Sequence, residues 1–396
     1  LGEEETALFR KEIGWEYEPF EIPTEVYADF KEKVADRGEA AYKSWEKLYD
    51  DYKAKYPELA SELEEVLSRK DIERLSKESF GFKNVGEAQA TRNSSQDSIN
   101  SIAAVLPTFF GGSADLSHSN MTFIKGEGLQ NNENRVARNV QFGVREFGMA
   151  TILNGLMLHG GVRVFGGTFF VFSDYLKAAL RLSALQNLPV TYVFTHDSIA
   201  VGEDGPTHEP IEHLASLRTI PNTYVFRPAD ATEAQAAWYL SQKVNNKPTS
   251  LVLTRQNLPV LENTSFEKVS KGAYVVYETS SDFDTILIAT GSEVALAVDV
   301  ARELEKEGSK VRVVSMPSVE LFEEQSKEYK EELLPRSVRR RVSLEMGNTA
   351  LWYKYVGLDG LAIGIDNFGA SAPANKVIEE YGFTVAKVVE RIKNEL

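Results

Sequence analysis

The sequence contains no cysteine, and that absence excludes disulfide bonds, thiolate catalysis and cysteine-ligated metal sites together. It agrees with a reducing compartment. No apolar run approaches the roughly 18 residues that a membrane-spanning helix needs, so we expect a soluble protein that binds no membrane. An excess of basic residues is also missing. The net charge of −15 argues against non-specific binding to nucleic acid, which requires a positively charged surface.

An initiator methionine is absent as well, because the chain begins with Leu1-Gly2-Glu3-Glu4, and no signal-peptide pattern follows. We therefore interpret the sequence as part of a longer one. Its 396 residues are enough for two or three domains at roughly 150 residues each. The first section, up to about residue 80, is charged and helix-rich. Its charge pattern favours a solvated helical connector.

Two further sections have the pattern of α/β domains. Between about residues 82 and 261, short apolar or β-branched runs alternate with stretches of helical spacing. The predicted strands of this section are 162–165, 190–195, 223–226 and 250–254, and its predicted helices are 169–188 and 232–243. From about residue 271, a strand at 284–290, a helix at 293–307 and a strand at 310–314 follow. The alternation predicts the α/β class, with two consecutive, mainly parallel sheets flanked by helices.

Candidate binding residues follow directly after three of these strands. Ligands of open α/β sheets collect at the carboxyl ends of parallel strands. The strand 190–195 leads into His196, and 250–254 leads into Arg255. The strand 162–165 leads into a Gly-Gly-Thr turn and then Phe169. A histidine, an arginine and a glycine–aromatic turn at one edge predict a site for an anionic ligand with a ring.

The loop after His196 concentrates polar chemistry. Glycine and proline mark 201–210 as a loop, and it carries Glu203, Asp204, His208 and Glu209. A metal site is one interpretation, although the spacing matches neither His-Glu-x-x-His nor a zinc framework. We favour hydrogen bonding and proton transfer to a polyol substrate, because imidazoles and carboxylates suit acid–base chemistry near neutral pH.

A series of motifs, in a fixed order, resembles the transketolase family over essentially the whole chain. They are Phe110-Gly-Gly-Ser-Ala-Asp-Leu116 with Ser119-Asn120, Gly143-Val-Arg-Glu-Phe-Gly-Met149, Thr168-Phe-Phe-Val-Phe-Ser-Asp-Tyr175, Thr195-His-Asp-Ser198, Gly202-Glu-Asp-Gly-Pro-Thr-His208, 250–257, Ser315-Met-Pro317 and Phe368-Gly-Ala-Ser-Ala-Pro373. The resemblance implies a helical section at 1–80, a pyrimidine-binding domain at 81–262 and a C-terminal α/β domain at 263–396. It also implies a two-carbon ketol transfer from a ketose phosphate to an aldose phosphate, with thiamine diphosphate as cofactor.

The resemblance assigns roles to ten residues. Glu146 is the activating glutamate, which hydrogen bonds to the aminopyrimidine ring of the cofactor so that this ring can accept a proton. Without the resemblance, we would interpret Glu146 as an ion-pair partner of Arg145 in the first turn of a helix. An aromatic pocket for the same ring is formed by Phe169, Phe172 and Tyr175, which we expect on one helix because of their spacing.

By the same resemblance, the substrate phosphate is held by Arg92, Ser119, His196 and Arg255. Asp204 binds a substrate hydroxyl, and His208 lies near the reacting carbon.

The Gly-Asp-Gly pattern that binds the diphosphate and its Mg²⁺ or Ca²⁺ in such enzymes does not occur in this sequence. We therefore expect the N-terminal diphosphate-binding domain to be absent apart from its tail, with no metal ligand in this chain. The resemblance further implies a cytoplasmic homodimer of the pentose phosphate pathway, with the active site between subunits. On this basis we predict a chain that is inactive alone.

Two other interpretations stay open at this point. The β subunit of a 2-oxo acid dehydrogenase has the same two-domain content, but it is not expected to carry Arg92, Arg255 or the Gly-Glu-Asp-Gly-Pro-Thr-His loop. A non-catalytic, transketolase-like module is the other, and Glu146 and His208 argue against it.

Overall fold

The computed structural model describes residues 2–396 of the chain. The chain divides between residues 65 and 66 into two compact units, Leu1–Glu65 and Val66–Leu396. None of the helices in the described residues combines the length and the apolar character that a membrane span requires.

The first unit is helical, as predicted for this section of the chain. Its helices are α1 (Glu3–Glu12), α2 (Thr24–Phe30), the π-helical turn η1 (Lys31–Ala35), α3 (Asp36–Lys55) and the beginning of α4 (Pro57–Leu67). α2, η1 and α3 follow one another without a break. Ion pairs one helical turn apart, such as Lys43 with Glu39 at 3.1 Å, support these exposed helices. The rings of Trp45 and Tyr49 stack along α3 with their centroids 5.4 Å apart.

The second unit contains a six-stranded parallel sheet in the order β3-β2-β4-β5-β7-β6. The strands are β2 (Phe109–Ser113), β3 (Asn139–Gln141), β4 (Arg163–Phe169), β5 (Thr191–Thr195), β6 (Tyr224–Phe226) and β7 (Thr249–Leu253). In the register, Thr195 pairs with Phe169 on one side and with Leu253 on the other. The carboxyl ends of three neighbouring strands are therefore level.

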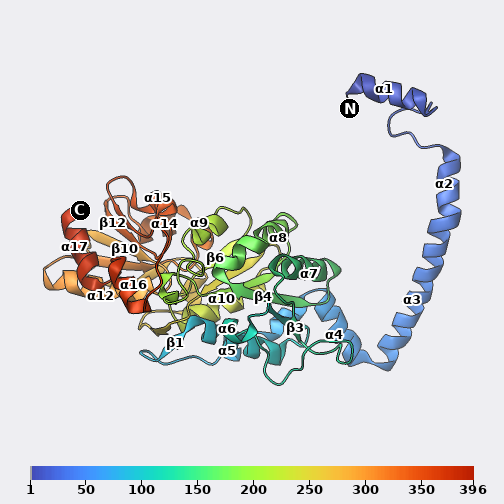
Figure 1. The fold of residues 1–396 in the computed structure, drawn as a ribbon. Coiled ribbons are helices and arrows are strands. Elements are labelled where there is room, and N and C mark those ends of the chain that lie inside the picture. The colour runs from blue at the N-terminus through green and yellow to red at the C-terminus, as the bar shows by residue number, and fades with distance from the viewer. Residues whose placement is uncertain (1) are drawn as a thin grey trace. The chain divides into compact units, whose positions relative to one another are not determined.

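Helices cover both faces of this sheet because successive strand residues point to opposite sides. Tyr192 and Phe194 belong to the core cluster under α7 (Glu146–His159) and α8 (Ser173–Leu185). Val193, between them, belongs to the cluster under α5 (Thr91–Val105) and α10 (Ala231–Lys243). Figure 1 shows α7 on one side of β4 and α5 on the other. At Gly166, an added Cβ would lie 2.5 Å from a methyl carbon of Leu153, so glycine lets α7 pack closely on β4.

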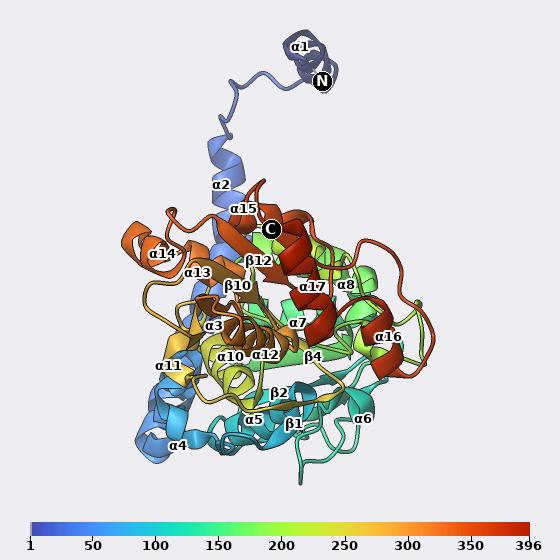
Figure 2. The same ribbon diagram turned by 90° about the vertical axis from the view of Figure 1, so that its left-hand side faces the viewer.

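A second, mixed sheet has the order β13-β12-β10-β11-β9. Its strands are β9 (Tyr274–Glu278), β10 (Thr285–Ala289), β11 (Val311–Ser315), β12 (Arg340–Leu344) and β13 (Leu361–Ile363), and only β9 is antiparallel. One face is covered by α12 (Glu293–Lys306) and α17 (Val385–Glu395). The other is covered by α13 (Val319–Glu323), α14 (Lys327–Leu333) and α15 (Tyr353–Val356). Figure 2 shows α17 and α14 on opposite sides of β12.

Short elements connect and flank the two sheets. They are η2 (Lys70–Arg74), η3 (Lys77–Ser79), β1 (Ala88–Ala90), α6 (Ser117–Asn120), η4 (Phe170–Phe172), η5 (Ile199–Val201), α9 (His213–Arg218), β8 (Asn257–Pro259), α11 (Phe266–Val269), η6 (Ala350–Trp352) and α16 (Ala374–Glu380). The antiparallel pair β1–β8 brings the residues before α5 beside those after β7.

Arg227 joins the two sheets through buried ion pairs. It follows β6 directly and is fully buried. Its Nη2 lies 2.8 Å from Oδ2 of Asp197, which follows β5, and its Nη1 pairs with Glu293, the first residue of α12. It also donates a hydrogen bond of 3.1 Å to the carbonyl of Thr290, the residue after β10. The carboxyl edges of the two sheets are thus held together by one guanidinium.

We expect the substitution Arg227→Met to lower the free energy of unfolding by about 3–5 kcal/mol, because it leaves two buried carboxylates without a cation. Urea unfolding followed by tryptophan fluorescence measures this change. The control is Arg302→Met, which removes an exposed pair with Asp299 and should change the same quantity by less than about 1 kcal/mol. Equal effects of the two substitutions would contradict the role of Arg227.

Candidate active site at the carboxyl edge of the parallel sheet

Two threonines fix the start of α5 against the end of β7. The Thr91 amide donates a hydrogen bond of 3.1 Å to Oγ1 of Thr254, and the Thr254 amide donates one of 2.7 Å to Oγ1 of Thr91. Both residues are buried. Because Arg92 follows Thr91 and Arg255 follows Thr254, this reciprocal pair brings two arginines to the same edge of the sheet.

Arg92, Arg255 and Ser119 form a group of hydrogen-bond donors that still have N–H or O–H groups free to bind a ligand. The Nη1 atom of Arg92 donates a hydrogen bond of 2.9 Å to the Ser119 carbonyl, which ties α5 to α6. The Nε atom of Arg92 is buried and has no hydrogen-bond partner. Burial lowers the pKa of Arg92, and the nearby charge of Arg255 acts in the same direction. Two guanidiniums this close favour an anion between them, since arginines bind phosphate oxygens well.

His196 stands beside these arginines at the end of β5, in a conformation that few residues adopt. Its φ is +63°, the left-handed region that favours glycine, and strain of this kind is typical of functional positions. A chain of hydrogen bonds orients its ring. Ser113 Oγ donates to Asn120 Oδ1 at 2.8 Å, Asn120 Nδ2 donates to Thr195 Oγ1 at 2.6 Å, and this hydroxyl lies 2.8 Å from Nδ1 of His196. When the Thr195 hydroxyl donates its hydrogen bond to Nδ1, the single proton of the neutral ring is on Nε2, which can donate it to a ligand.

The surroundings keep the His196 ring neutral. Burial is the largest cause, and the positive charges of Arg92 and Arg255 act in the same direction, so the pKa of His196 falls to about 3. His208 adds a smaller contribution. A neutral imidazole beside two arginines is a hydrogen-bond donor that adds no third charge to the group.

Aromatic side chains form a wall next to His196. The rings of Phe169 and Phe172 stack with centroids 5.9 Å apart, and Tyr175 lies 6.1 Å from Phe172. The ring of His208 meets both phenylalanines edge-on, at 6.1 and 5.6 Å, and Phe169 lies 3.8 Å from His196. The prediction that the three aromatics share one helix is wrong. Phe169 ends β4, Phe172 ends η4 and Tyr175 lies in α8, because the strand continues four residues past its predicted end.

Glu146 begins α7, and its carboxylate has no partner in the described residues 2–396. The alternative of an ion pair with Arg145 is not observed, because Nη1 of Arg145 donates to the carbonyl of Phe142 at 3.1 Å instead. Glu146 is half-buried and Asp204 is exposed on its loop. Within the described part of the chain, no hydrogen bond or ring contact joins either of them to the other predicted site residues. Hydrogen bonds, ring contacts or charge effects thus link the other eight residues, whereas in residues 2–396 none of these links Glu146 or Asp204 to them.

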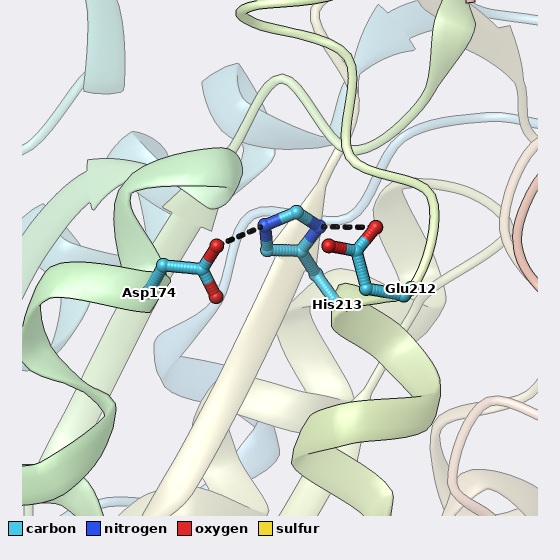
Figure 3. Close-up of side chains that lie close together, drawn as sticks. All are labelled: Asp174, Glu212 and His213. Atoms are coloured by element: carbon cyan, nitrogen blue, oxygen red, sulfur yellow. Dashed lines mark hydrogen bonds and ion pairs between the residues drawn. The ribbon is translucent and has the colours of Figure 1, made fainter. Parts of the chain in front are cut away.

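Sequence reasoning gave no role to His213, whose ring bridges α8 and α9 (Figure 3). Its Nε2 lies 3.2 Å from Oδ2 of Asp174 in the first turn of α8, and its Nδ1 lies 3.8 Å from Oε2 of Glu212. Single atoms of these three side chains lie within 4.8 Å of one another. Each carboxylate faces a different ring nitrogen, but only the contact of Nε2 with Asp174 is a hydrogen bond, and it links the start of α9 to the start of α8. The clustering of three histidines between residues 196 and 213 is the sequence feature that could have pointed to His213.

The fold and the site define an α/β protein that can hold an anionic ligand with a ring at the carboxyl edge of a parallel sheet. Family comparisons agree with this class. The family described as "Transketolase, pyrimidine binding domain" matches residues 87–260. "Transketolase-like TK C-terminal domain" matches 272–384, and "Transketolase, thiamine diphosphate binding domain" matches 1–71.

Individual relatives give the same result. The chain is 66% identical over 394 residues to a probable transketolase of Streptococcus pneumoniae and 51% identical over 398 residues to the transketolase of Bacillus subtilis. These alignments cover 100% and 99% of this chain and 60% of each relative, so the chain spans about 60% of their length. Its fold matches the transketolase structure from Leishmania mexicana with a TM-score of 0.91 at 38% identity, over 99% of this chain and 57% of that one. The chain belongs to the transketolase family.

The match at residues 1–71 corrects one prediction. We expected the diphosphate-binding domain to be absent except for its tail, but the family model for that domain matches the whole helical first unit and a few residues beyond it. The absence of this domain is therefore not supported, and neither is the inactivity of the chain that we inferred from it.

We expect His196 to stay neutral as the pH falls from 7 to about 4. Because its pKa in the folded state lies below the ordinary value of 6.5, the histidine contributes stability above pH 6.5 that is lost progressively toward pH 3. Long-range ¹H–¹⁵N NMR spectra of the imidazoles measure its protonation, with His196→Asn for assignment. Arg255→Met should raise this pKa, whereas Arg181→Met on α8 should leave it unchanged. Protonation of His196 near pH 6.5 would contradict the assignment.

Proposed function

We propose that the protein is a transketolase, which transfers a two-carbon ketol unit reversibly from a ketose phosphate to an aldose phosphate. The observation that carries the proposal is the convergence of Arg92, Arg255 and a neutral His196 beside an aromatic wall. The buried, unpartnered Nε of Arg92 supports an anionic ligand at this position. We also propose the division into 1–80, 81–262 and 263–396 as the helical section, the pyrimidine-binding domain and the C-terminal domain.

The substrate phosphate would be held by the two arginines, with Ser119 and His196 as additional donors. Guanidinium groups make charge-assisted, bidentate hydrogen bonds to phosphate oxygens. The neutral His196 would donate through Nε2 in the tautomer in which Nδ1 accepts the proton of the Thr195 hydroxyl. Sugar phosphates as substrates are supported by the transketolase of Pichia stipitis, whose structures include complexes with sedoheptulose-7-phosphate and fructose-6-phosphate.

Thiamine diphosphate fits the remaining residues of the site. Its aminopyrimidine ring is flat and heteroaromatic, and such rings stack on phenylalanine side chains. Phe172 and Tyr175 present half-buried and exposed ring surface for this contact, beside Phe169. The unpaired carboxyl of Glu146 is available to hydrogen bond to a ring nitrogen. When bound, the cofactor supplies a thiazolium ring that serves as an electron sink for cleavage of a carbon–carbon bond. We also propose that Mg²⁺ is the counter-ion of the cofactor's diphosphate.

His208 and Asp204 would act on the polyol part of the substrate. The Thr207 hydroxyl lies 2.8 Å from Nδ1 of His208, which leaves Nε2 to donate or accept a proton at a substrate oxygen. Asp204 is exposed and unpaired within the described residues, so its carboxylate can accept hydrogen bonds from substrate hydroxyls. The 2-oxo acid dehydrogenase subunit and the non-catalytic module are not supported by the comparisons.

A homodimer would complete the site, and apolar side chains on α7 and α8 support this part of the proposal. Phe147, next to Glu146, is 50% exposed, Ile152 is 53% exposed and Leu185 is 67% exposed. Tyr175, in the aromatic wall, is exposed as well. Apolar groups gathered around a site indicate a surface that a partner covers. A cytoplasmic role in the pentose phosphate pathway completes the proposal.

The substitution Glu146→Gln tests the function. It retains the shape of the side chain and removes its ability to exchange a proton, so the rate of ketol transfer should fall at least about 100-fold. The assay supplies thiamine diphosphate, Mg²⁺ and a ketose phosphate with an aldose phosphate acceptor. Glu328→Gln, which makes the same change in the first turn of α14, is the control and should retain full activity. Unchanged transfer by the Glu146 variant would contradict the proposal.

The substitution Ile152→Glu tests the dimer. A charge in the middle of an apolar interface should shift the protein from dimer to monomer, and sedimentation velocity at micromolar concentration measures that shift. Leu358→Glu, at a position that is 97% exposed in the C-terminal region, is the matched control and should remain dimeric. A monomer before any substitution would exclude this surface as a stable interface.

A further inference from the structure

The loop that carries Asp204 and His208 is shaped by the C-terminal part of the chain. Ser371 Oγ donates a hydrogen bond of 2.7 Å to the carbonyl of Glu203. Gly202 has a φ of +82°, and an added Cβ there would lie 2.9 Å from the backbone nitrogen of Ala374. The backbones of residues 202–209 and 368–374 therefore approach each other closely. The position of this loop depends on that contact as well as on its own sheet.

Glu209 ends this loop and is buried in the contact. It is 1% exposed, and neither carboxyl oxygen has a hydrogen-bond partner. Its Oε2 fills the space in front of Gly369, where an added Cβ would lie 1.8 Å away. No ion pair reaches it in the described residues 2–396. An ionised carboxylate in such a place carries a large desolvation penalty, whereas a neutral carboxyl carries a much smaller one.

The charges around Glu209 do not compensate for its burial. Burial raises the pKa of Glu209 to about 7, and the charge of Asp204 acts in the same direction. The peptide groups of Ala370 and Gly202 oppose the rise, although they do not reach full hydrogen-bonding geometry.

The elements packed against Glu209 bring no cation to it. The turn η5 and the segment 368–373 carry only apolar, glycine, serine and proline residues. The remaining titratable groups of the loop are Glu203, which is exposed, and His208. Next to the segment, Asp366 is held by Thr349 and Asn348, and Lys376 is exposed on α16.

We propose that Glu209 is a positioning residue whose neutral carboxyl holds the loop 202–209, and with it Asp204 and His208, against the segment 368–373. When the carboxyl releases its proton to solvent, the buried negative charge weakens this contact and the loop becomes mobile. The consequence for substrate binding rests on the proposed function. The protonation of Glu209 and its effect on the loop do not rest on the proposed function. Experiments can therefore contradict this inference and the proposed function separately.

Thermal unfolding as a function of pH tests the protonation. The folded state holds the Glu209 proton up to a pKa of about 7, whereas the unfolded chain releases it near the ordinary value of 4.5. This carboxyl therefore reduces stability progressively as the pH rises from 4.5 to 7, and the reduction is constant above that. The Tm of Glu209→Gln should exceed that of the unsubstituted protein by an amount that grows over this window and then levels off.

Glu203→Gln provides the matched control, because it removes the same charge from an exposed position of the same loop. Its Tm should follow that of the unsubstituted protein at every pH. A Tm difference for Glu209→Gln that is independent of pH would overturn the proposal. So would failure of this variant to fold at pH 5, where an amide should replace the neutral carboxyl.

Hydrogen exchange followed by mass spectrometry tests the effect on the loop. After correction for the intrinsic pH dependence of exchange, protection of residues 202–208 should fall several-fold between pH 6 and pH 8 in the unsubstituted protein. It should stay constant in Glu209→Gln. Gly369→Ala, whose new methyl group displaces the carboxyl, should lower protection at both pH values. Equal pH dependence in the unsubstituted protein and Glu209→Gln would contradict the proposal, whether or not ketol transfer is found.

Discussion

The fully buried guanidinium of Arg227 constrains the geometry of everything around it. It lies between carboxylates from two different sheets, and a buried cation tolerates little displacement from its partners, because each lost contact exposes a charge to a medium of low polarizability. Space for it depends on Gly291, where an added Cβ would lie 2.6 Å from the guanidinium carbon. A second buried pair, Arg218 with Glu345 through two hydrogen bonds of 2.8 Å, spans the same two regions.

This constraint extends into the candidate site through a single peptide bond. Asp197, a partner of Arg227, is the residue after His196. The backbone of His196 is held in the left-handed region, and the fixed position of Asp197 stabilises that conformation from the C-terminal side. From the N-terminal side, Thr195 is held by Asn120. The histidine is therefore positioned by the packing of two sheets and by the strand that precedes it, which is how a strained residue persists in a folded protein.

The fold was predictable where the sequence carried local information. The strands β5, β6, β7, β10 and β11 were found within about one residue of their observed bounds, since buried parallel strands are continuous apolar runs. Seven of the thirteen described strands were not predicted, and two of these lack a continuous apolar run. β2 contains two glycines, and β12 begins with two arginines whose side chains are half-buried at its start. Phe169 was assigned to a helix because its spacing to Phe172 and Tyr175 also suits a helical face, whereas pairing with Thr195 keeps it in β4.

The site shows the same division between local and long-range information. His196 and Arg255 could be inferred from strand ends, because topology alone brings those ends together. Arg92 could not, since its place depends on the contact of Thr91 with Thr254, which lies 163 residues away. Its assignment needed the family resemblance. Glu209 was visible as a loop carboxylate, but its chemistry depends on Gly369 and on burial, which no local pattern contains.

The neutral state of His196 follows first from burial and then from the two arginines, and in turn it permits the arginines to act. Two cations already attract an anion to this edge of the sheet, and a third would add repulsion within the group whenever no anion is bound. A neutral imidazole with its Nδ1 occupied by Thr195 adds a directed donor without that penalty. Binding of a phosphate would offset the field of the arginines and make protonation of the ring easier. Within the proposed function, the hydrogen bond from His196 would therefore strengthen with the charge of the ligand and would favour a dianionic phosphate over a carboxylate of similar size.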